Sequence, residues 1–228
     1  MTTQDPTSAP WPPTETPSWL RDELAKIPAP TADMDAPEND ADPVKAAERK
    51  TVLSMPKSYR WATAEAPELI ERVTDPRDSS GRPMPVATLI ALAPTTPRML
   101  ITGPADAGKT SIACAMLREW SRVNRLPATF VHSFRIGMAR IQTKAGTGEA
   151  EIVETAMRAP LVLIDDVGSE NHTANNAMLD IVFERHAEDF PMWLTTGWTS
   201  QQIIARYGAG FLRRIVERAL VVKVGREV

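Results

Sequence analysis

The stretch Gly103-Pro-Ala-Asp-Ala-Gly-Lys-Thr110 decides the fold class of this 228-residue chain. It follows an apolar segment, 99–102, that is expected to be a strand, and it opens an amphipathic helix predicted to reach about Asn124. The pattern GxxxxGK[ST] allows backbone N–H groups to wrap around phosphates at the positive end of a helix. The sequence therefore predicts a P-loop ATP-binding site. Its expected nucleotide contacts are Gly103, Pro104, Ala105, Asp106, Ala107, Gly108, Lys109, Thr110 and Ser111.

Two aspartates follow a second apolar stretch, Leu-Val-Leu-Ile at 161–164. A run of this kind is typical of a strand that is buried on both faces of a parallel sheet. Asp165 is expected to hold Mg²⁺ together with the hydroxyl of Thr110, while Lys109 contacts the β- and γ-phosphates. Asp166 is expected to orient or deprotonate the attacking water.

Polar residues also end a third strand, Trp193-Leu-Thr-Thr-Gly197, next to the expected position of the γ-phosphate. Thr196 is therefore a candidate catalytic residue. Three arginines, Arg213, Arg214 and Arg218, lie on a late predicted helix. Such a helix can supply an arginine finger to the nucleotide of a neighbouring subunit, or can simply present a solvated basic face.

Strands and helices are predicted to alternate along the chain. The expected strands are 99–102, 128–133, 161–164, 192–195 and 219–224, and the expected helices are 65–73, 86–92, 109–124, 134–143, 149–157, 174–189, 200–207 and 211–218. This alternation indicates an α/β domain of three layers with a mostly parallel sheet.

The N-terminal part differs in composition from the rest. Residues 1–43 hold nine of the twenty prolines, with nine acidic and two basic residues, a net charge of −7, whereas the remaining residues carry +4. Proline lacks an N–H donor and fixes φ, so little regular structure is expected there. We therefore predict a largely disordered, acidic extension over 1–50 and an ATPase domain over 51–228. One amphipathic helix is expected at 17–27, where it docks either on the domain or on a partner.

Several functional classes are excluded by composition. The chain has a net charge of −3, three scattered histidines and a single cysteine, Cys114. These features predict neither an internal disulfide nor a histidine metal cluster. No apolar run is long enough to span a membrane, and no secretory signal is apparent. A cytoplasmic location and no membrane partner are therefore expected, with Cys114 as a small buried residue of the helix after the P-loop.

From about 55 to 226 the chain resembles the AAA+ ATPases of the DnaC-type helicase loaders and their relatives, the IstB-type transposition helpers. The matching stretches are MPKSYRWA (55–62), GPADAGKTSIACAM (103–116), FVHSFRIGMARIQ (130–142), LVLIDDVGSE (161–170), LDIVFERH (179–186), WLTTGWT (193–199) and YGAGFLRRIVE (207–217). The resemblance implies an ATP-dependent protein that delivers a hexameric replicative helicase onto DNA, with the helicase bound through residues 1–50. It also implies self-association in which Arg214 is the arginine finger, and it places Arg226 near the second sensor arginine.

The chain departs from the family pattern in two places. The first-sensor strand usually ends in Thr-Asn, whereas Thr196 is followed here by Gly197. Without an amide to position the attacking water, slow hydrolysis is expected. The sequence also ends at Val228, directly after Gly225-Arg226, so no separate C-terminal lid domain is expected and a neighbouring subunit is predicted to enclose the nucleotide.

In similar proteins, the region 134–144 contributes to a surface that binds single-stranded DNA. Its candidate contacts here are Phe134, Arg135, Arg140 and Lys144. Basic side chains neutralise phosphates and an aromatic ring stacks on a base. The alternative is an amphipathic helix with a solvated basic face.

Three functions remain open at this point. The first is a DnaC-like helicase loader, for which residues 1–50 supply a partner-binding arm. The second is an IstB-type helper that remodels target DNA for a transposase. The third is a nucleotide-gated adaptor that binds ATP with little hydrolysis, which Gly197 favours.

Overall fold

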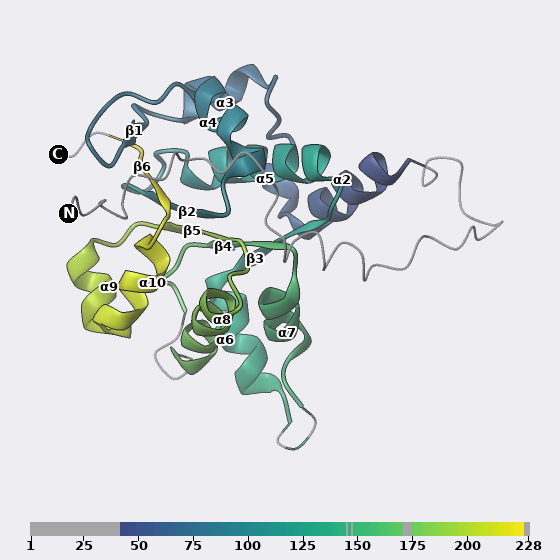
Figure 1. Ribbon diagram of the computed structural model, residues 1–228, viewed down its shortest axis with the longest axis vertical. Coiled ribbons are helices and arrows are strands. Elements are labelled where there is room, and N and C mark those ends of the chain that lie inside the picture. The colour runs from purple at the N-terminus through teal and green to yellow at the C-terminus, as the bar shows by residue number, and fades with distance from the viewer. Residues whose placement is uncertain (1–41, 145, 147, 171–174, 226–228) are drawn as a thin grey trace, which may run out of the picture. The chain divides into compact units, whose positions relative to one another are not determined.

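The computed structural model describes residues 42–144, 146, 148–170 and 175–225. In this part of the chain, six strands form one sheet in the order β1-β6-β2-β5-β4-β3 (Figure 1). The strands are β1 (Arg77–Asp78), β2 (Arg98–Thr102), β3 (Ala128–His132), β4 (Leu161–Asp165), β5 (Met192–Thr196) and β6 (Leu220–Lys223). All neighbouring pairs are parallel except β1 and β6, which are antiparallel. The predicted α/β class with a mostly parallel sheet is confirmed.

Helices cover both faces of the sheet and complete the three layers (Figure 1). One face carries α2 (Pro43–Ser54), α3 (Pro67–Arg72), α4 (Val86–Leu92) and α5 (Lys109–Asn124), with the short 3₁₀ helices η2 (Lys57–Tyr59) and η3 (Ala93–Thr95). The other carries α6 (Ser133–Gln142), α7 (Glu151–Arg158), α8 (Asn175–Ala187), α9 (Ser200–Tyr207) and α10 (Ala209–Val216). Cys114 is buried in α5, as expected.

The register of the parallel strands brings their carboxyl ends to one edge of the sheet. Thr102 pairs with Thr196, and His132 pairs with Asp165. Every residue of β4 and β5 is buried, which explains their continuous apolar runs. The polar residues at the carboxyl ends of these strands therefore lie close together. The P-loop begins at the same end of the sheet, directly after β2.

Helix α2 is the main element that the sequence prediction missed. Asp42 caps it by accepting a hydrogen bond from the Val44 N–H at 2.9 Å, and a proline occupies its first turn. Its Thr51 hydroxyl donates to Ser121 Oγ of α5 at 2.9 Å and accepts from the Ala128 N–H at 2.9 Å. Residues 43–50, which the sequence prediction assigned to the extension, thus belong to a helix that packs against α5 and β3.

Smaller differences concern the end of the chain. Helix α10 ends at Val216 rather than at Arg218, because Arg218 adopts a left-handed conformation with φ 57° that turns the chain into β6. The predicted helix at 17–27 and Arg226 lie outside the described residues. No helix in the described ranges has the length and apolar character that a membrane span requires.

A buried arginine joins three segments of the core. The Arg185 guanidinium of α8 donates to the carbonyls of Ala156 and Met157 at 2.9 and 3.0 Å, to that of Ala159 at 2.8 Å, and to that of Pro191. Burial lowers the pKa of Arg185 to about 9. Its hydrogen bonds satisfy carbonyls that end α7 and carbonyls that flank β4 and β5, so one side chain fixes the start of both strands.

Candidate nucleotide-binding site

The P-loop runs from Gly103 to Gly108 between β2 and α5, and its backbone requires glycine at both ends. Gly103 has a φ of 149°, and a Cβ there would lie 2.0 Å from the carbonyl oxygen of Val224. Gly108 has a φ of 87°, and a Cβ there would lie 2.5 Å from the carbonyl oxygen of Arg72. A side chain at either glycine would clash with the backbone and displace the loop. The loop leads into the N-terminus of α5, the positive end of the helix dipole. The geometry fits the phosphates of a nucleotide.

Lys109 is held inside this loop. Its ammonium group donates to the carbonyl oxygens of Gly103 at 2.9 Å and Pro104 at 2.6 Å. Partial burial lowers the pKa of Lys109, while the charges of Asp166 and Asp165 act in the opposite direction. The cation is thus kept at the mouth of the loop, where phosphate oxygens can replace the two carbonyls as acceptors.

Asp165 ends β4 directly beneath the P-loop. One of its oxygens accepts hydrogen bonds from the hydroxyls of Thr110 at 2.8 Å and Thr195 at 2.6 Å. The residue is 5 % exposed, and burial raises the pKa of its carboxyl group. A carboxylate and a hydroxyl in contact supply the hard oxygen ligands that Mg²⁺ prefers, so Thr110 and Asp165 fit the predicted metal role.

We expect Asp165→Asn to stabilise the protein without nucleotide and to weaken Mg²⁺ binding at the candidate metal site. The amide oxygen still accepts from both threonines, and the cost of burying a charge disappears. The free energy of unfolding should rise by about 1 kcal/mol at pH 7, the usual size of a stabilising substitution. Urea denaturation measures this change.

The pH dependence gives a control for this prediction. Because the pKa of Asp165 is raised in the folded protein, the wild type gains stability as the pH falls through that pKa towards the ordinary value of 3.8. The advantage of Asp165→Asn should therefore shrink on acidification. An unchanged difference between pH 7 and pH 4 would contradict the assigned cause.

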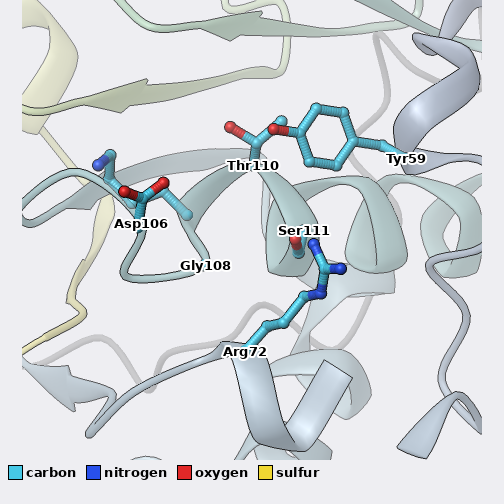
Figure 2. Close-up of a pocket in the computed structure, with 7 residues that line it drawn as sticks. Tyr59, Arg72, Asp106, Gly108, Thr110 and Ser111 are labelled. Atoms are coloured by element: carbon cyan, nitrogen blue, oxygen red, sulfur yellow. The ribbon is translucent and has the colours of Figure 1, made fainter. Parts of the chain in front are cut away.

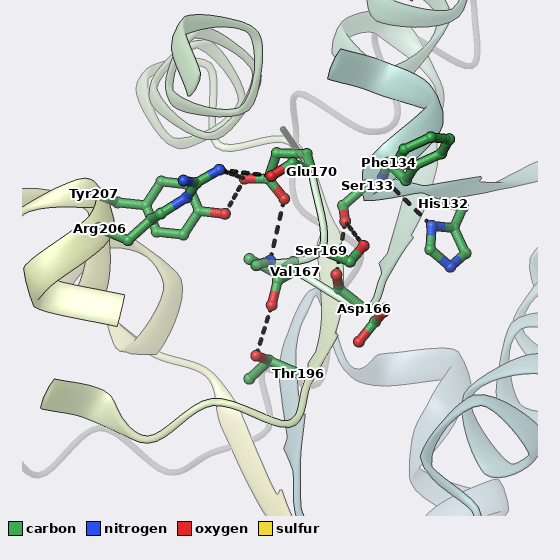
Figure 3. A network of polar contacts seen from close by, with 11 residues as sticks. His132, Ser133, Phe134, Asp166, Val167, Ser169, Glu170, Thr196, Arg206 and Tyr207 are labelled. Carbon is green, nitrogen blue, oxygen red and sulfur yellow. Dashed lines mark hydrogen bonds and ion pairs between the residues drawn. The ribbon is translucent and has the colours of Figure 1, made fainter. Parts of the chain in front are cut away.

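Asp166 follows with a left-handed backbone, φ 57°, and an exposed side chain. Its N–H donates to Thr195 Oγ1 at 2.9 Å. Its carbonyl accepts from Ser133 Oγ at 2.6 Å (Figure 3). The backbone is thus held from β5 and from α6 while the carboxylate remains accessible to solvent. This arrangement suits a group that orients or deprotonates water.

Thr196 lies beside this loop, but its hydroxyl is directed to the backbone. It donates to the Val167 carbonyl at 2.7 Å and accepts from the Trp198 N–H at 3.0 Å, and the residue is fully buried. Thr195, which the sequence prediction did not single out, makes the contacts to both aspartates instead. In the sequence, Thr195 could have been noticed as a polar residue that follows the apolar residues of the same strand.

Two further residues line the P-loop pocket, which has a volume of about 220 Å³ (Figure 2). Tyr59 comes from η2 and Arg72 from the end of α3, and they face the start of α5 with Thr110 and Ser111. The Arg72 guanidinium also lies 5.0 Å from the centre of the Trp61 ring. Both residues come from the segment before the P-loop. Tyr59 lies within the stretch MPKSYRWA, but the sequence did not indicate that it or Arg72 lines this pocket.

A buried polar cluster connects the loop after Asp166 to α9 (Figure 3). The Glu170 carboxylate accepts from the Gly168 N–H at 3.1 Å and from the Tyr207 hydroxyl. Arg206 lies 3.9 Å from the same carboxylate and donates to the Glu170 carbonyl at 2.7 Å. The conformation of the loop that carries Asp166 is thus tied to α9, and through it to α10.

The predicted arginine finger lies on α10, away from the P-loop pocket. The Arg214 guanidinium stacks 4.0 Å above the Phe183 ring of α8 and donates to the Gly210 carbonyl at 2.9 Å. Arg213 beside it is exposed, and Arg226 belongs to the undescribed end of the chain. Arg214 therefore does not join the site of its own chain.

The four predicted DNA contacts divide into two groups. Phe134 and Arg135 are exposed in the first turn of α6. Arg140, by contrast, forms ion pairs with Glu149 and, at 2.6 Å, with Asp180. Lys144 is exposed after the helix. The charge of Arg140 is thus balanced within the protein, while the first turn of α6 presents its cation and ring to solvent.

No protein-family model matches the sequence, and no curated protein matches it. The DnaC helicase loader matches the structure with a TM-score of 0.56 and 17 % identity, over 75 % of this chain and all of that chain. A protein from Streptococcus pyogenes serotype M3, described as a primosome component, matches with a TM-score of 0.55 and 16 % identity, over 77 % and 95 % of the two chains. A DNA replication initiation factor matches with a TM-score of 0.50 and 14 % identity, over 61 % and 44 %. The chain therefore shares its α/β fold with the DnaC helicase loader.

Proposed function

We propose that this protein is an AAA+ ATPase that binds ATP and Mg²⁺, hydrolyses the nucleotide slowly, and loads or remodels a hexameric replicative helicase on DNA during replication initiation. The observation that carries the nucleotide chemistry is the contact of Thr110 with Asp165 directly beside Lys109. The ordered motifs and the fold shared with the DnaC helicase loader support the replication role.

In this proposal each residue has a defined task. Backbone N–H groups of the P-loop bind the phosphates, and Lys109 balances the charge on the β- and γ-phosphates. Thr110 and Asp165 would hold Mg²⁺, which, when bound, neutralises charge on the phosphate oxygens. Asp166 accepts a proton from the water that attacks the γ-phosphorus, and the bond to the β-phosphate oxygen breaks to release ADP and phosphate.

Slow turnover follows from the residues around the first-sensor strand. Gly197 offers no side chain to position water, and the Thr196 hydroxyl already donates to the Val167 carbonyl. A nucleophilic water held only by Asp166 is poorly oriented, and orientation contributes much of the rate of such reactions. The same two observations favour the adaptor as a second candidate, in which ATP is bound and barely hydrolysed.

A neighbouring subunit is proposed to complete the site. Arg214 lies on α10, outside the P-loop pocket of its own chain, and would act on the nucleotide of another copy. Self-association through Arg214 would make hydrolysis depend on protein concentration, and Arg214→Ala should remove that dependence.

Removal of residues 1–41 should leave nucleotide binding intact and abolish capture of the replicative helicase. The deletion ends before α2, because α2 packs on the domain and its loss would disturb the fold. A pull-down with the full chain, the shortened chain and the helicase of the same host measures the effect. Undiminished capture by the shortened chain would refute the role of the N-terminal arm.

A further inference from the structure

A buried carboxylate, that of Glu170, lies at the end of the loop that begins with Asp166. Its side chain is 1 % exposed. One carboxylate oxygen accepts from the Gly168 N–H at 3.1 Å, and the other accepts from the Tyr207 hydroxyl (Figure 3). A charge is costly to bury unless it is paired and hydrogen-bonded, so these contacts keep the carboxylate in this place.

The loop from Asp166 to Glu170 contains two residues with a left-handed backbone. Asp166 has a φ of 57° and Gly168 has a φ of 109°. A residue with a side chain is disfavoured in this region, and such a conformation persists where surrounding contacts hold it. The position of the Asp166 carboxylate therefore depends on the contacts of this loop more than on local preference.

Two groups hold the backbone N–H groups of the loop. The N–H groups of Asp166 and Val167 donate to Thr195 of β5, the first to Oγ1 at 2.9 Å and the second to the carbonyl at 2.8 Å. The Gly168 N–H donates instead to the Glu170 carboxylate. Glu170 thus continues, beyond the strand, the hydrogen bonding that β5 begins.

Two residues of α9 fix the Glu170 carboxylate in turn. Arg206, whose side chain is 4 % exposed, lies 3.9 Å from one carboxylate oxygen and donates to the Glu170 carbonyl at 2.7 Å. The Tyr207 hydroxyl donates to the same carboxylate oxygen. Burial raises the pKa of Tyr207, so its hydroxyl stays protonated and serves as the donor. The orientation of Glu170 is thus set by one neutral and one charged partner from α9.

We propose that Glu170 and Tyr207 are positioning residues for Asp166. The Tyr207 hydroxyl orients the Glu170 carboxylate, and this carboxylate holds the Gly168 N–H and with it the backbone that carries Asp166. The proposal rests on the proposed ATP hydrolysis, in which Asp166 accepts a proton from the attacking water. Neither residue lines the P-loop pocket, so both are expected to affect the rate of hydrolysis and not the affinity for nucleotide.

Tyr207→Phe separates the hydroxyl from the rest of this side chain. The Tyr207 ring stacks on Phe211 of α10 with 4.4 Å between the ring centres, and its centre lies 6.4 Å from that of the Trp198 ring. Phenylalanine keeps these packing contacts and removes only the donor to Glu170. A loss of turnover in this variant would therefore report on the hydrogen bond.

Steady-state ATP hydrolysis by the full chain, with Mg²⁺ and at a fixed protein concentration, tests the proposal. Tyr207→Phe and Glu170→Gln should each lower kcat by about tenfold, because a misplacement of about 1 Å can cost about 100-fold in rate. KM and the affinity for a fluorescent ATP analogue should stay unchanged. Tyr207→Phe added to Glu170→Gln should lower kcat little further, because the hydroxyl acts through that carboxylate.

The matched control is Ser121→Ala in α5. It also removes a buried hydroxyl, which donates to the Leu126 carbonyl at 2.7 Å, and it should leave kcat unchanged. Hydrogen exchange measured by mass spectrometry without nucleotide gives a second readout that needs no hydrolysis. Tyr207→Phe should raise the exchange of peptides that cover 166–170, whereas Ser121→Ala should not.

An unchanged kcat in Tyr207→Phe, an equal fall in Ser121→Ala, or independent effects of the two substitutions in the double variant would overturn the proposal. All variants are checked by their melting temperatures, and Tyr207→Phe decides alone where Glu170→Gln fails to fold. A wild type that binds the ATP analogue without turnover would refute the proposed hydrolysis instead. The exchange rates then decide whether Tyr207 holds the loop, and equal exchange in wild type and Tyr207→Phe would overturn that role.

Discussion

Lys109→Ala is expected to lower the affinity for ATP by at least about 100-fold, because charge-assisted hydrogen bonds to two phosphates contribute about 1.5–3 kcal/mol each. The Lys109 ammonium now donates to the carbonyls of Gly103 and Pro104, so it is already placed at the loop that would hold the phosphates. Titration with a fluorescent ATP analogue, with Mg²⁺ present, measures the loss.

The matched control for this prediction is Lys45→Ala, which removes an exposed lysine of α2 and should leave the affinity unchanged. Both variants should unfold cooperatively, since neither side chain is part of the core. Tight ATP binding by Lys109→Ala would show that the nucleotide site has been placed wrongly.

Arg185→Met is expected to lower the free energy of unfolding by about 3 kcal/mol or more, because several buried carbonyl acceptors lose their donor and remain unpaired. The four carbonyls that Arg185 satisfies belong to Ala156, Met157, Ala159 and Pro191. Methionine fills much of the space but donates no hydrogen bond. Urea unfolding, followed by circular dichroism, measures the shift in the transition midpoint.

The control is Arg158→Met on α7. Its side chain is 62 % exposed and forms an ion pair with Glu184 at 3.3 Å, and surface pairs of this kind contribute about 0–1 kcal/mol. Arg185→Lys keeps a charge but lacks the planar fork, so it should also destabilise the protein. An effect of Arg185→Met no larger than that of Arg158→Met would contradict the role assigned to the buried guanidinium.

Much of the fold could be predicted because its signals are local. The apolar runs of β2, β4 and β5 and the helix after the P-loop are legible in short windows of sequence. Helix α2 was missed because the preceding proline-rich composition hid its signals, an Asp cap followed by proline. Strand β1 has only two residues, and it exists through its pairing with β6, which no local pattern reveals.

The candidate site likewise contains residues that local sequence motifs predicted and residues that they did not. The P-loop and the two aspartates form spaced motifs, and the sheet register brings them together. Thr195, Tyr59 and Arg72 come from separate segments, and the three-dimensional arrangement shows which contacts they make at the site. For the DNA contacts, the sequence showed that Arg140 is basic but could not show that Glu149 and Asp180 pair with it.

Steady-state ATP hydrolysis by the wild type and by Asp166→Ala, with and without single-stranded DNA, tests the central claim most directly. The account predicts slow, Mg²⁺-dependent turnover by the wild type that single-stranded DNA changes. Asp166→Ala should bind ATP with unchanged affinity and show no turnover above background. Equal rates for the two proteins, both binding ATP, would contradict an ATPase and leave the nucleotide-gated adaptor in its place.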